Sequence, residues 1–421
     1  MVNTNVNFLN DNFLTTGTGT DMTELINITD ELTKKTKTKL FPVKKANFLL
    51  YKEEREKSVI FREINDFIAM EDIATMNCIV DEVELEKENF SEAFFKAAKK
   101  TAVMKINNEY FILSEKALFS LKDKFKADAI FMTEYSLPTL LTLREAANNN
   151  SASVKVVYRE VGDIKKIFYV GCEKFNELLN DSFMVEMLDK LPIEMAREMD
   201  LINYVISQEK TIIYSCFPEI EEEIKEKYQN FNLEPVLIAQ NSLIGESSLI
   251  FQEGWKTPKG MILRGNGVSF KHLFQEKRNH TFENLEDEII EKVKEKIFVD
   301  YFELPKRFEA LSEIEITSEE MSNDEMRVTY ENIVSEVIRK CFKTELSRKK
   351  KALIKERLRN HFTASMPITA LMVTSWFFEI LGDLIKNDCS RDLIDAIEKS
   401  TSLIPFFDFE KELKTLNILA Y

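Results

Sequence analysis

The side chains most often used for catalysis are few in this chain and stand apart from one another. None of its three histidines belongs to the HExxH pattern of a zinc protease. No Ser or Cys stands in the GxSxG setting that presents a nucleophile at a strand-to-helix turn. The sequence therefore argues against hydrolysis by a Ser or Cys nucleophile, and we predict no catalytic residue. The three histidines are His272, His280 and His361.

The cysteines are equally isolated, with no CxxC pair and no companion His at zinc spacing. We therefore predict no metal site and no cofactor. Single cysteines of this kind are typical of a reducing compartment, where the thiol packs as a small apolar group. The five are Cys78, Cys172, Cys216, Cys341 and Cys389.

One glycine segment has part of the pattern of a phosphate-binding loop. Gly260 and Gly265 have the required spacing, but Asn266 and Gly267 stand where the loop needs Lys followed by Ser or Thr. The segment is better explained by a tight turn with positive φ at Asn266 and Gly267.

Acidic residues are plentiful, so their number does not exclude a two-metal nuclease, which is the one enzymatic alternative that stays open. Such a site needs carboxylates that converge in a cleft. The acidic runs 221–223 and 287–288 fall on the polar faces of expected helices, where charge usually marks the solvated side.

Two basic segments stand out from a chain whose formal net charge is −15. That charge opposes binding of a phosphate backbone by the surface as a whole, so nucleic-acid binding needs a local patch. In the first segment Lys35, Lys37 and Lys39 alternate, which places them on one side of an extended strand.

The second basic segment is predicted to be a helix. Arg348, Lys351, Lys355 and Arg359 fall at i, i+3, i+7 and i+11 and form one stripe. Leu353, Leu358 and Phe362 are expected to turn inward. The stripe predicts a track for a phosphate backbone, and the alternative is a solvated helix that balances an acidic protein.

The distribution of strand and helix signals predicts an α+β fold. We expect an extended N-terminal arm at 1–45, a mixed strand and helix core with β-hairpins at 46–305, and a mostly helical C-terminal region at 306–421. One hairpin is expected around Val161-Gly-Asp163. The most apolar stretch, 368–381, is too short to cross a bilayer, and the first residues lack a signal peptide, so no membrane partner is predicted.

The middle of the chain, about 105–285, resembles a family carried by bacteriophages, prophages and plasmids, the domain of unknown function numbered 932. The similar motifs, in family order, are Tyr110-Phe-Ile-Leu-Ser-Glu-Lys-Ala-Leu118, Gly171-Cys-Glu-Lys-Phe175, Asn241-Ser-Leu-Ile-Gly245 and Arg264-Gly-Asn-Gly267. Basic residues after the last glycine also match, at Lys277, Arg278 and His280. The resemblance implies a mobile-element setting and adds Arg278 and His280 as nucleic-acid contacts. It implies no reaction.

Three hypotheses follow from these observations. The first is a non-enzymatic mobile-element protein, located in the cytoplasm of a host bacterium, that binds or anneals single-stranded DNA during replication or recombination. The second is a structural or virion-associated protein that acts through contacts with copies of itself or with phage or host proteins. The third is an acidic inhibitor that imitates nucleic acid toward a basic host enzyme.

Overall fold

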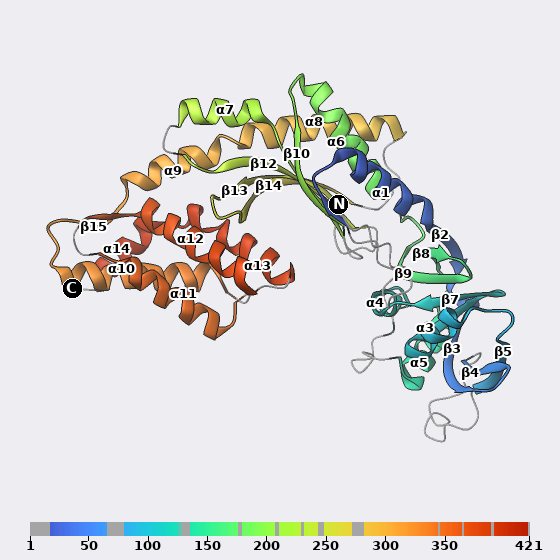
Figure 1. Ribbon diagram of the computed structural model, residues 1–421. Coiled ribbons are helices and arrows are strands. Elements are labelled where there is room, and N and C mark those ends of the chain that lie inside the picture. Colours follow the sequence, from blue (N-terminus) through green and yellow to red (C-terminus); the bar gives the residue numbers. More distant parts are fainter. Residues whose placement is uncertain are drawn as a thin grey trace.

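A computed structural model of the chain shows two β-sheets, each packed against helices, followed by a layer of helices (Figure 1). It describes residues 17–421 except 65–79, 126, 128–134, 176–178, 207–209, 229–230, 243–247, 272–281, 344–345, 364–365, 389–390 and 420–421. This arrangement confirms the predicted α+β class and the predicted helical C-terminal region.

The first sheet has eight strands in the order β2-β8-β9-β7-β6-β3-β4-β5. Neighbouring strands are antiparallel apart from the β7–β9 pair, which is parallel. The strands are β2 (Thr36–Pro42), β3 (Ala46–Glu54), β4 (Ser58–Ile64), β5 (Val80–Glu86), β6 (Ala102–Ile106), β7 (Glu109–Leu113), β8 (Ser153–Val161) and β9 (Ile164–Cys172).

Each face of this sheet packs against helices because apolar side chains alternate along its strands. In β6, Met104 contributes to the core formed with α4 (Glu115–Phe125) and α5 (Leu137–Asn148). The next residue back, Val103, contributes to the opposite core, formed with α3 (Glu92–Lys100). The predicted hairpin is confirmed, since β8 and β9 are joined at Gly162, which has φ +62°.

The second sheet has six antiparallel strands in the order β1-β10-β11-β12-β13-β14. They are β1 (Gly17–Gly19), β10 (Asp200–Ile206), β11 (Thr211–Cys216), β12 (Glu234–Asn241), β13 (Leu249–Lys256) and β14 (Ile262–Phe270). The helices packed with it are α1 (Met22–Lys35), α6 (Asp181–Met195), α7 (Pro218–Lys227), α8 (Phe282–Asp300) and α9 (Glu303–Glu313).

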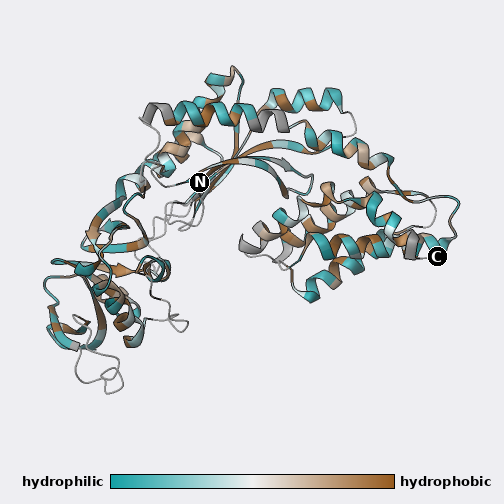
Figure 2. Cartoon of the chain, turned by 180° about the vertical axis from the view of Figure 1, so that it is seen from behind, coloured by the Kyte–Doolittle hydropathy of each residue, from teal (hydrophilic) through white to brown (hydrophobic). Residues whose placement is uncertain are grey.

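The C-terminal helices share one hydrophobic core with the six-stranded sheet. Helices throughout the molecule carry both hydrophobic and hydrophilic residues, as expected when one face is buried (Figure 2). The C-terminal elements are β15 (Glu315–Thr317), α10 (Asn323–Cys341), α11 (Arg348–His361), β16 (Ile368–Thr369), α12 (Ala370–Asp388), α13 (Arg391–Thr401), the 3-10 turn η2 (Ile404–Phe406) and α14 (Phe409–Leu419).

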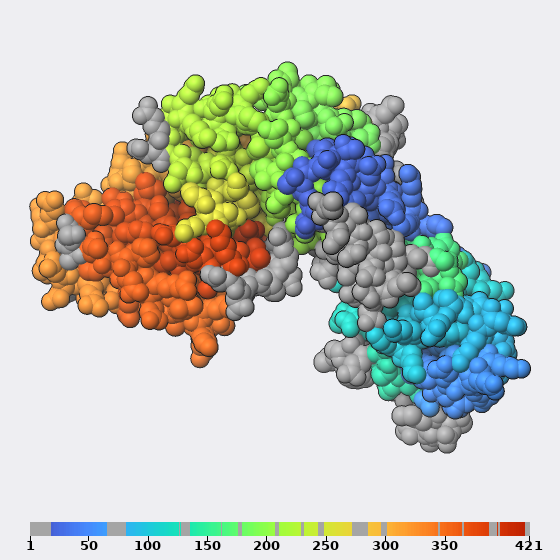
Figure 3. Space-filling model, viewed as in Figure 1, coloured from blue at the N-terminus to red at the C-terminus, as the bar shows by residue number. Residues whose placement is uncertain are grey.

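The eight-stranded sheet is inserted into the rest of the molecule. The chain begins with β1 and α1, which pack with the six-stranded sheet and α6, and enters the first sheet at Thr36. It leaves that sheet after Cys172 and returns to α6. Residues 36–172 therefore form a lobe of their own, which Figures 1 and 3 show to one side of the molecule.

The expected extended arm at 1–45 is wrong over the part that the structure describes. Met22–Lys35 is helix α1, whose Asp21 side chain accepts a hydrogen bond from the Glu24 backbone at 3.0 Å and so caps the first turn. Residues 36–42 are an edge strand rather than a free arm. The division expected at 305 falls inside α9, which packs into the core shared with the C-terminal helices.

The expected glycine turn at Asn266 and Gly267 is also wrong. Both lie inside strand β14, and the turn stands earlier, at Gly260, where φ is +81°. The glycines serve close packing instead. A Cβ on Gly265 would collide with the buried Glu253 side chain, where the pairing of β13 with β14 is shifted by a bulge.

Helix α13 closes the open edge of β14. The Ile262 backbone N–H donates to the Glu398 carboxylate at 3.2 Å, and the Arg264 N–H donates to the Ser402 hydroxyl at 2.6 Å. The Arg264 guanidinium lies 3.4 Å from the same Glu398 carboxylate. These side chains take the place of a neighbouring strand, so this edge is protected from pairing with another chain.

Candidate functional site

Helix α11 carries the densest positive charge in the described part of the chain. Its sequence, RKKKALIKERLRNH, contains seven Lys and Arg residues against one acid, Glu356. The Ser347 hydroxyl caps the helix by accepting a hydrogen bond from the Lys350 backbone at 3.3 Å. The first turn contains three cations and no acid, although the helix dipole makes this end positive.

Two buried apolar residues fix the orientation of α11. Ile354 and Leu358, one turn apart, are completely buried, and the helix packs between α10 and α12. On the α10 side the Tyr330 hydroxyl donates to the Leu358 carbonyl at 2.8 Å. On the α12 side the rings of His361 and Trp376 stack at 5.7 Å. The remaining residues of α11 are exposed or half-buried, and the helix lies along the lower side of the helical layer in Figure 1.

The predicted stripe exists, but only part of it is available to a ligand. Lys351 donates to the Lys343 backbone carbonyl at 2.8 Å, and Arg359 pairs with Glu331 at 2.7 Å. Arg348 and Lys355 have no protein partner within the described residues. The expected inward position of Leu353 is wrong, because its side chain is 36% exposed and its neighbour Ile354 is the buried residue.

This change of helical phase exposes basic residues that the predicted stripe missed. Lys350, Arg357 and His361 lie at i, i+7 and i+11 on the flank that faces α12. The spacing was present in the sequence as a second stripe. Within the described chain, five cationic side chains of α11 have neither a hydrogen-bond nor an ion-pair partner: Arg348, Lys349, Lys350, Lys355 and Arg357.

The lysines of the first predicted basic patch instead form ion pairs with acidic residues of the protein. Lys37 pairs with Glu160 and Lys39 pairs with Glu109, and Lys165 joins the two acids at 3.8 Å and 2.5 Å. The hydrogen bond to Glu160 raises the pKa of Lys37, whereas burial lowers the pKa of Lys39. This network attaches edge strand β2 to the strands beside it.

Lys35 differs from the other two lysines because it lies in the last turn of α1. It pairs with Glu31 one turn earlier in that helix. The structure thus places the three lysines on a helix end and an edge strand, in a different part of the molecule from α11 (Figure 1). The other two predicted contacts, Arg278 and His280, lie outside the described residues, so they stay predictions.

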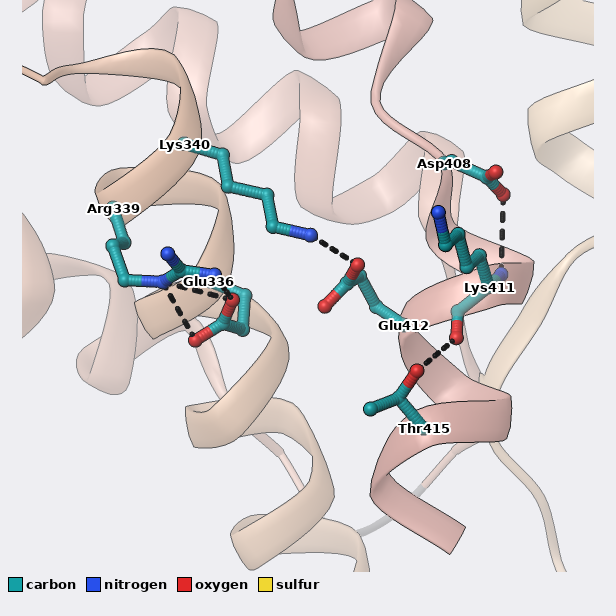
Figure 4. A network of polar contacts seen from close by, with 7 residues as sticks. All are labelled: Glu336, Arg339, Lys340, Asp408, Lys411, Glu412 and Thr415. Carbon is teal, nitrogen blue, oxygen red and sulfur yellow. Dashed lines mark hydrogen bonds and ion pairs between the residues drawn. The ribbon is translucent and has the colours of Figure 1, made fainter. Parts of the chain in front are cut away.

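On α10, the helix that precedes α11, two cations are paired with carboxylates. Lys340 of α10 pairs with the buried Glu412 of α14, and Arg339 forms a 2.5 Å pair with Glu336 (Figure 4). The Arg339 guanidinium lowers the pKa of Glu336 by hydrogen bonding to its carboxylate. Acids are thus available to pair with cations on the neighbouring helices, so the unpaired cations of α11 do not follow from a general shortage of acids.

Three of the cysteines lie in the described part of the chain. Cys172, Cys216 and Cys341 are free thiols, and burial raises the pKa of Cys341 to about 11. A thiol with a raised pKa is a poor nucleophile. Among the described residues no three His, Cys, Asp or Glu side chains gather as metal ligands would. No described helix is both long and apolar enough to cross a membrane.

Comparison of the chain with family models, with curated proteins and with solved structures finds no match. The resemblance to the domain of unknown function numbered 932 is therefore a prediction, and the candidate site depends on the geometry of α11 alone.

Proposed function

We propose that this protein binds a nucleic-acid strand through α11, without catalysing a reaction. One observation carries the proposal: a helix in a protein of net charge −15 holds five Lys and Arg side chains that have no partner within the described chain. Phosphates are the natural partners of such cations, because each contact releases a condensed counterion.

The position of these cations at the N-terminal end of α11 also favours a phosphate backbone as the ligand. Arg348, Lys349 and Lys350 lie in the first turn of α11, where the helix dipole adds positive potential to their own charge. Cations are disfavoured at that end when nothing compensates them. A bound phosphate backbone supplies the compensation that the described protein residues lack.

The proposed setting follows from the family resemblance, which supports a protein of a bacteriophage, prophage or plasmid in the cytoplasm of a bacterium. Single-stranded DNA formed during replication or recombination is the ligand that this setting favours. Lys35, Lys37 and Lys39 have carboxylate partners of their own, so the proposal does not depend on them.

A salt titration tests the proposal. Five phosphate contacts on a single strand predict a slope of about −3.5 in log K against log salt, which is an affinity loss of about 100-fold between about 50 and 200 mM salt. Binding is measured by fluorescence anisotropy with labelled oligothymidylate. No binding at about 50 mM salt, or an affinity that does not change with salt, overturns the proposal.

A pair of matched double variants tests whether nucleic acid binds at α11. Lys350→Glu with Arg357→Glu removes two cations of α11, and we expect the slope to fall by about 1.4. Lys411→Glu with Lys414→Glu makes the same change in net charge on the exposed surface of α14 and is expected to leave binding nearly unchanged. Equal losses in the two double variants would show that net charge, not α11, determines binding.

A second function, assembly through contacts between copies, is favoured by the two open edges of the eight-stranded sheet. In the described chain β2 pairs only with β8, and β5 pairs only with β4. Edge strand β5 carries exposed Glu82, Glu84 and Glu86, which oppose the pairing of β5 with a second β5. Lys37 and Lys39 of β2 are paired with Glu160 and Glu109, so β2 lacks that acidic charge, and pairing of β5 with β2 would run head to tail.

Light scattering over a range of protein concentration tests this second function. Head-to-tail assembly predicts a mass that grows with concentration and falls when Glu82 and Glu84 are both replaced by Lys. A monomer at every concentration contradicts it.

A further inference from the structure

Four aromatic rings meet at the C-terminal end of α11. Phe362 stacks on Tyr330 of α10 at 5.4 Å, with 30° between the rings. Trp376 of α12 meets the same Tyr330 edge-on at 5.8 Å. His361 stacks on Trp376 at 5.7 Å, with 26° between the rings. The cluster therefore joins three helices at one end of the cationic surface.

The burial of these rings divides the cluster into a core part and a surface part. Tyr330 is completely buried, its hydroxyl is bonded to the Leu358 carbonyl, and burial raises its pKa. His361, Phe362 and Trp376 are each only half-buried. The other tryptophan of the chain, Trp255, shows the contrast, since it is 1% exposed and surrounded by Phe231 and Tyr301.

The surface part of the cluster continues the row of basic residues that faces α12. Lys350, Arg357 and His361 lie on one flank of α11, and Trp376 stacks on the last of them. Eleven residues of helix separate the first from the last, a distance of about 16 Å. A phosphate backbone that follows Lys350 and Arg357 thus brings its bases to the half-buried rings.

We propose that Trp376 and His361 form a platform on which an unpaired base stacks, so that α11 binds single-stranded nucleic acid in preference to a duplex. This rests on the proposed function and adds to it the type of strand. A base in a duplex has both faces covered by its neighbours, whereas a base in a single strand has a free face. Every base has such a face, so the platform binds without sequence preference.

The two tryptophans make the platform observable in solution. Trp255 is buried, so a ligand that stacks on Trp376 changes only the Trp376 contribution to the fluorescence. We expect oligothymidylate to quench the emission to a saturating value and a duplex of equal length to leave it nearly unchanged. Trp376→Phe keeps a ring, so it should lose this signal while retaining its affinity in anisotropy.

Removing the ring is the decisive change. Trp376→Leu is expected to weaken single-strand binding by about tenfold or more, with the salt slope unchanged, because a stacking contact and no phosphate contact is lost. His361→Ala is a second variant, expected to act in the same direction. Phe119→Ala is the matched control, because Phe119 is 54% exposed but lies on α4 of the inserted lobe. Thermal unfolding of each variant checks that it folds.

The outcomes separate the platform from the proposed function. Unchanged single-strand affinity in folded Trp376→Leu and His361→Ala overturns the platform, and so does an equal loss of single-strand and duplex binding. In either case salt-dependent binding that is lost in the Lys350 and Arg357 variant still supports the proposed function. If wild-type protein binds neither ligand at low salt, the proposed function itself fails.

Discussion

Replacing Lys349 by Glu should make the protein more stable while weakening its binding of nucleic acid. Lys349 is exposed, lies in the first turn of α11 and has no partner in the described chain. A positive charge there opposes the helix dipole and a negative charge is favoured by it, each by about 0.3 to 1 kcal/mol. The substitution makes both changes, so the free energy of unfolding should rise by about 0.6 to 2 kcal/mol.

Lys34→Glu is the matched control with the opposite sign. Lys34 is also exposed, but it lies in the last turn of α1, where a cation is favoured. The same substitution should therefore lower the free energy of unfolding by a similar amount. Urea unfolding of both variants in low salt measures the two changes, and about 1 M salt should reduce both because it screens exposed charges.

The expected stabilisation is contradicted if Lys349→Glu fails to raise the free energy of unfolding in low salt while Lys34→Glu lowers it. That result would mean that the positive charge in the first turn of α11 is already compensated, so these cations would need no bound phosphate. If stability rises and affinity for oligothymidylate falls together, α11 keeps these cations for binding at the expense of stability, a common relation at functional sites.

Three further substitutions test the fold and its polar contacts. Ser402→Ala leaves the N–H of Arg264 on edge strand β14 without its acceptor, which should cost about 1 to 3 kcal/mol in urea unfolding. Gly265→Ala should destabilise by about 1 to 3 kcal/mol, and a Glu253→Ala background should relieve part of that loss, because the two side chains compete for one space. Burial raises the pKa of Asp181, so the folded state holds the proton of this carboxyl more tightly than the unfolded state does. Asp181 therefore lowers the free energy of unfolding as pH rises above about 3.9, the ordinary pKa of an Asp side chain. Asp181→Asn should flatten that part of the stability profile, and an unchanged profile would contradict the assignment.

Local patterns predicted much of the fold. The hairpin was readable because Gly162 and Asp163 separate two alternating strands and nothing distant is needed to form it. Helix α8, which spans Phe282–Asp300, was readable because Leu285, Ile289 and Val293 recur every four residues. Such elements depend on the order of residues within about ten positions, which a sequence displays directly.

The features that the sequence did not reveal depend on distant partners. Lys37 and Lys39 look like a basic patch in isolation, but Glu160 and Glu109 neutralise them from strands that lie 123 and 70 residues further along the chain. Asn266 and Gly267 look like a turn, but they lie inside strand β14, where the neighbouring Gly265 lies against the buried Glu253 side chain. In each case tertiary pairing decides the role of residues whose local pattern permits several.

The candidate site depends on a small difference in how one helix is turned. Leu353 and Ile354 are adjacent and both apolar, so either is a plausible inward residue, and the choice rotates the helix by about 100°. Ile354 is buried because it forms an i, i+4, i+8 row with Leu358 and Phe362 against α10 and α12. That choice leaves Lys350 and Arg357 on the flank where Trp376 lies, and it exposes Leu353.

A single strand that contacts both flanks of α11 should therefore be more sensitive to loss of Arg357 than to loss of Arg359, since Arg359 already has Glu331 as its partner. Comparing Arg357→Gln with Arg359→Gln in the same salt titration tests this, and a larger loss from Arg359→Gln would place the strand on the α10 side of the helix.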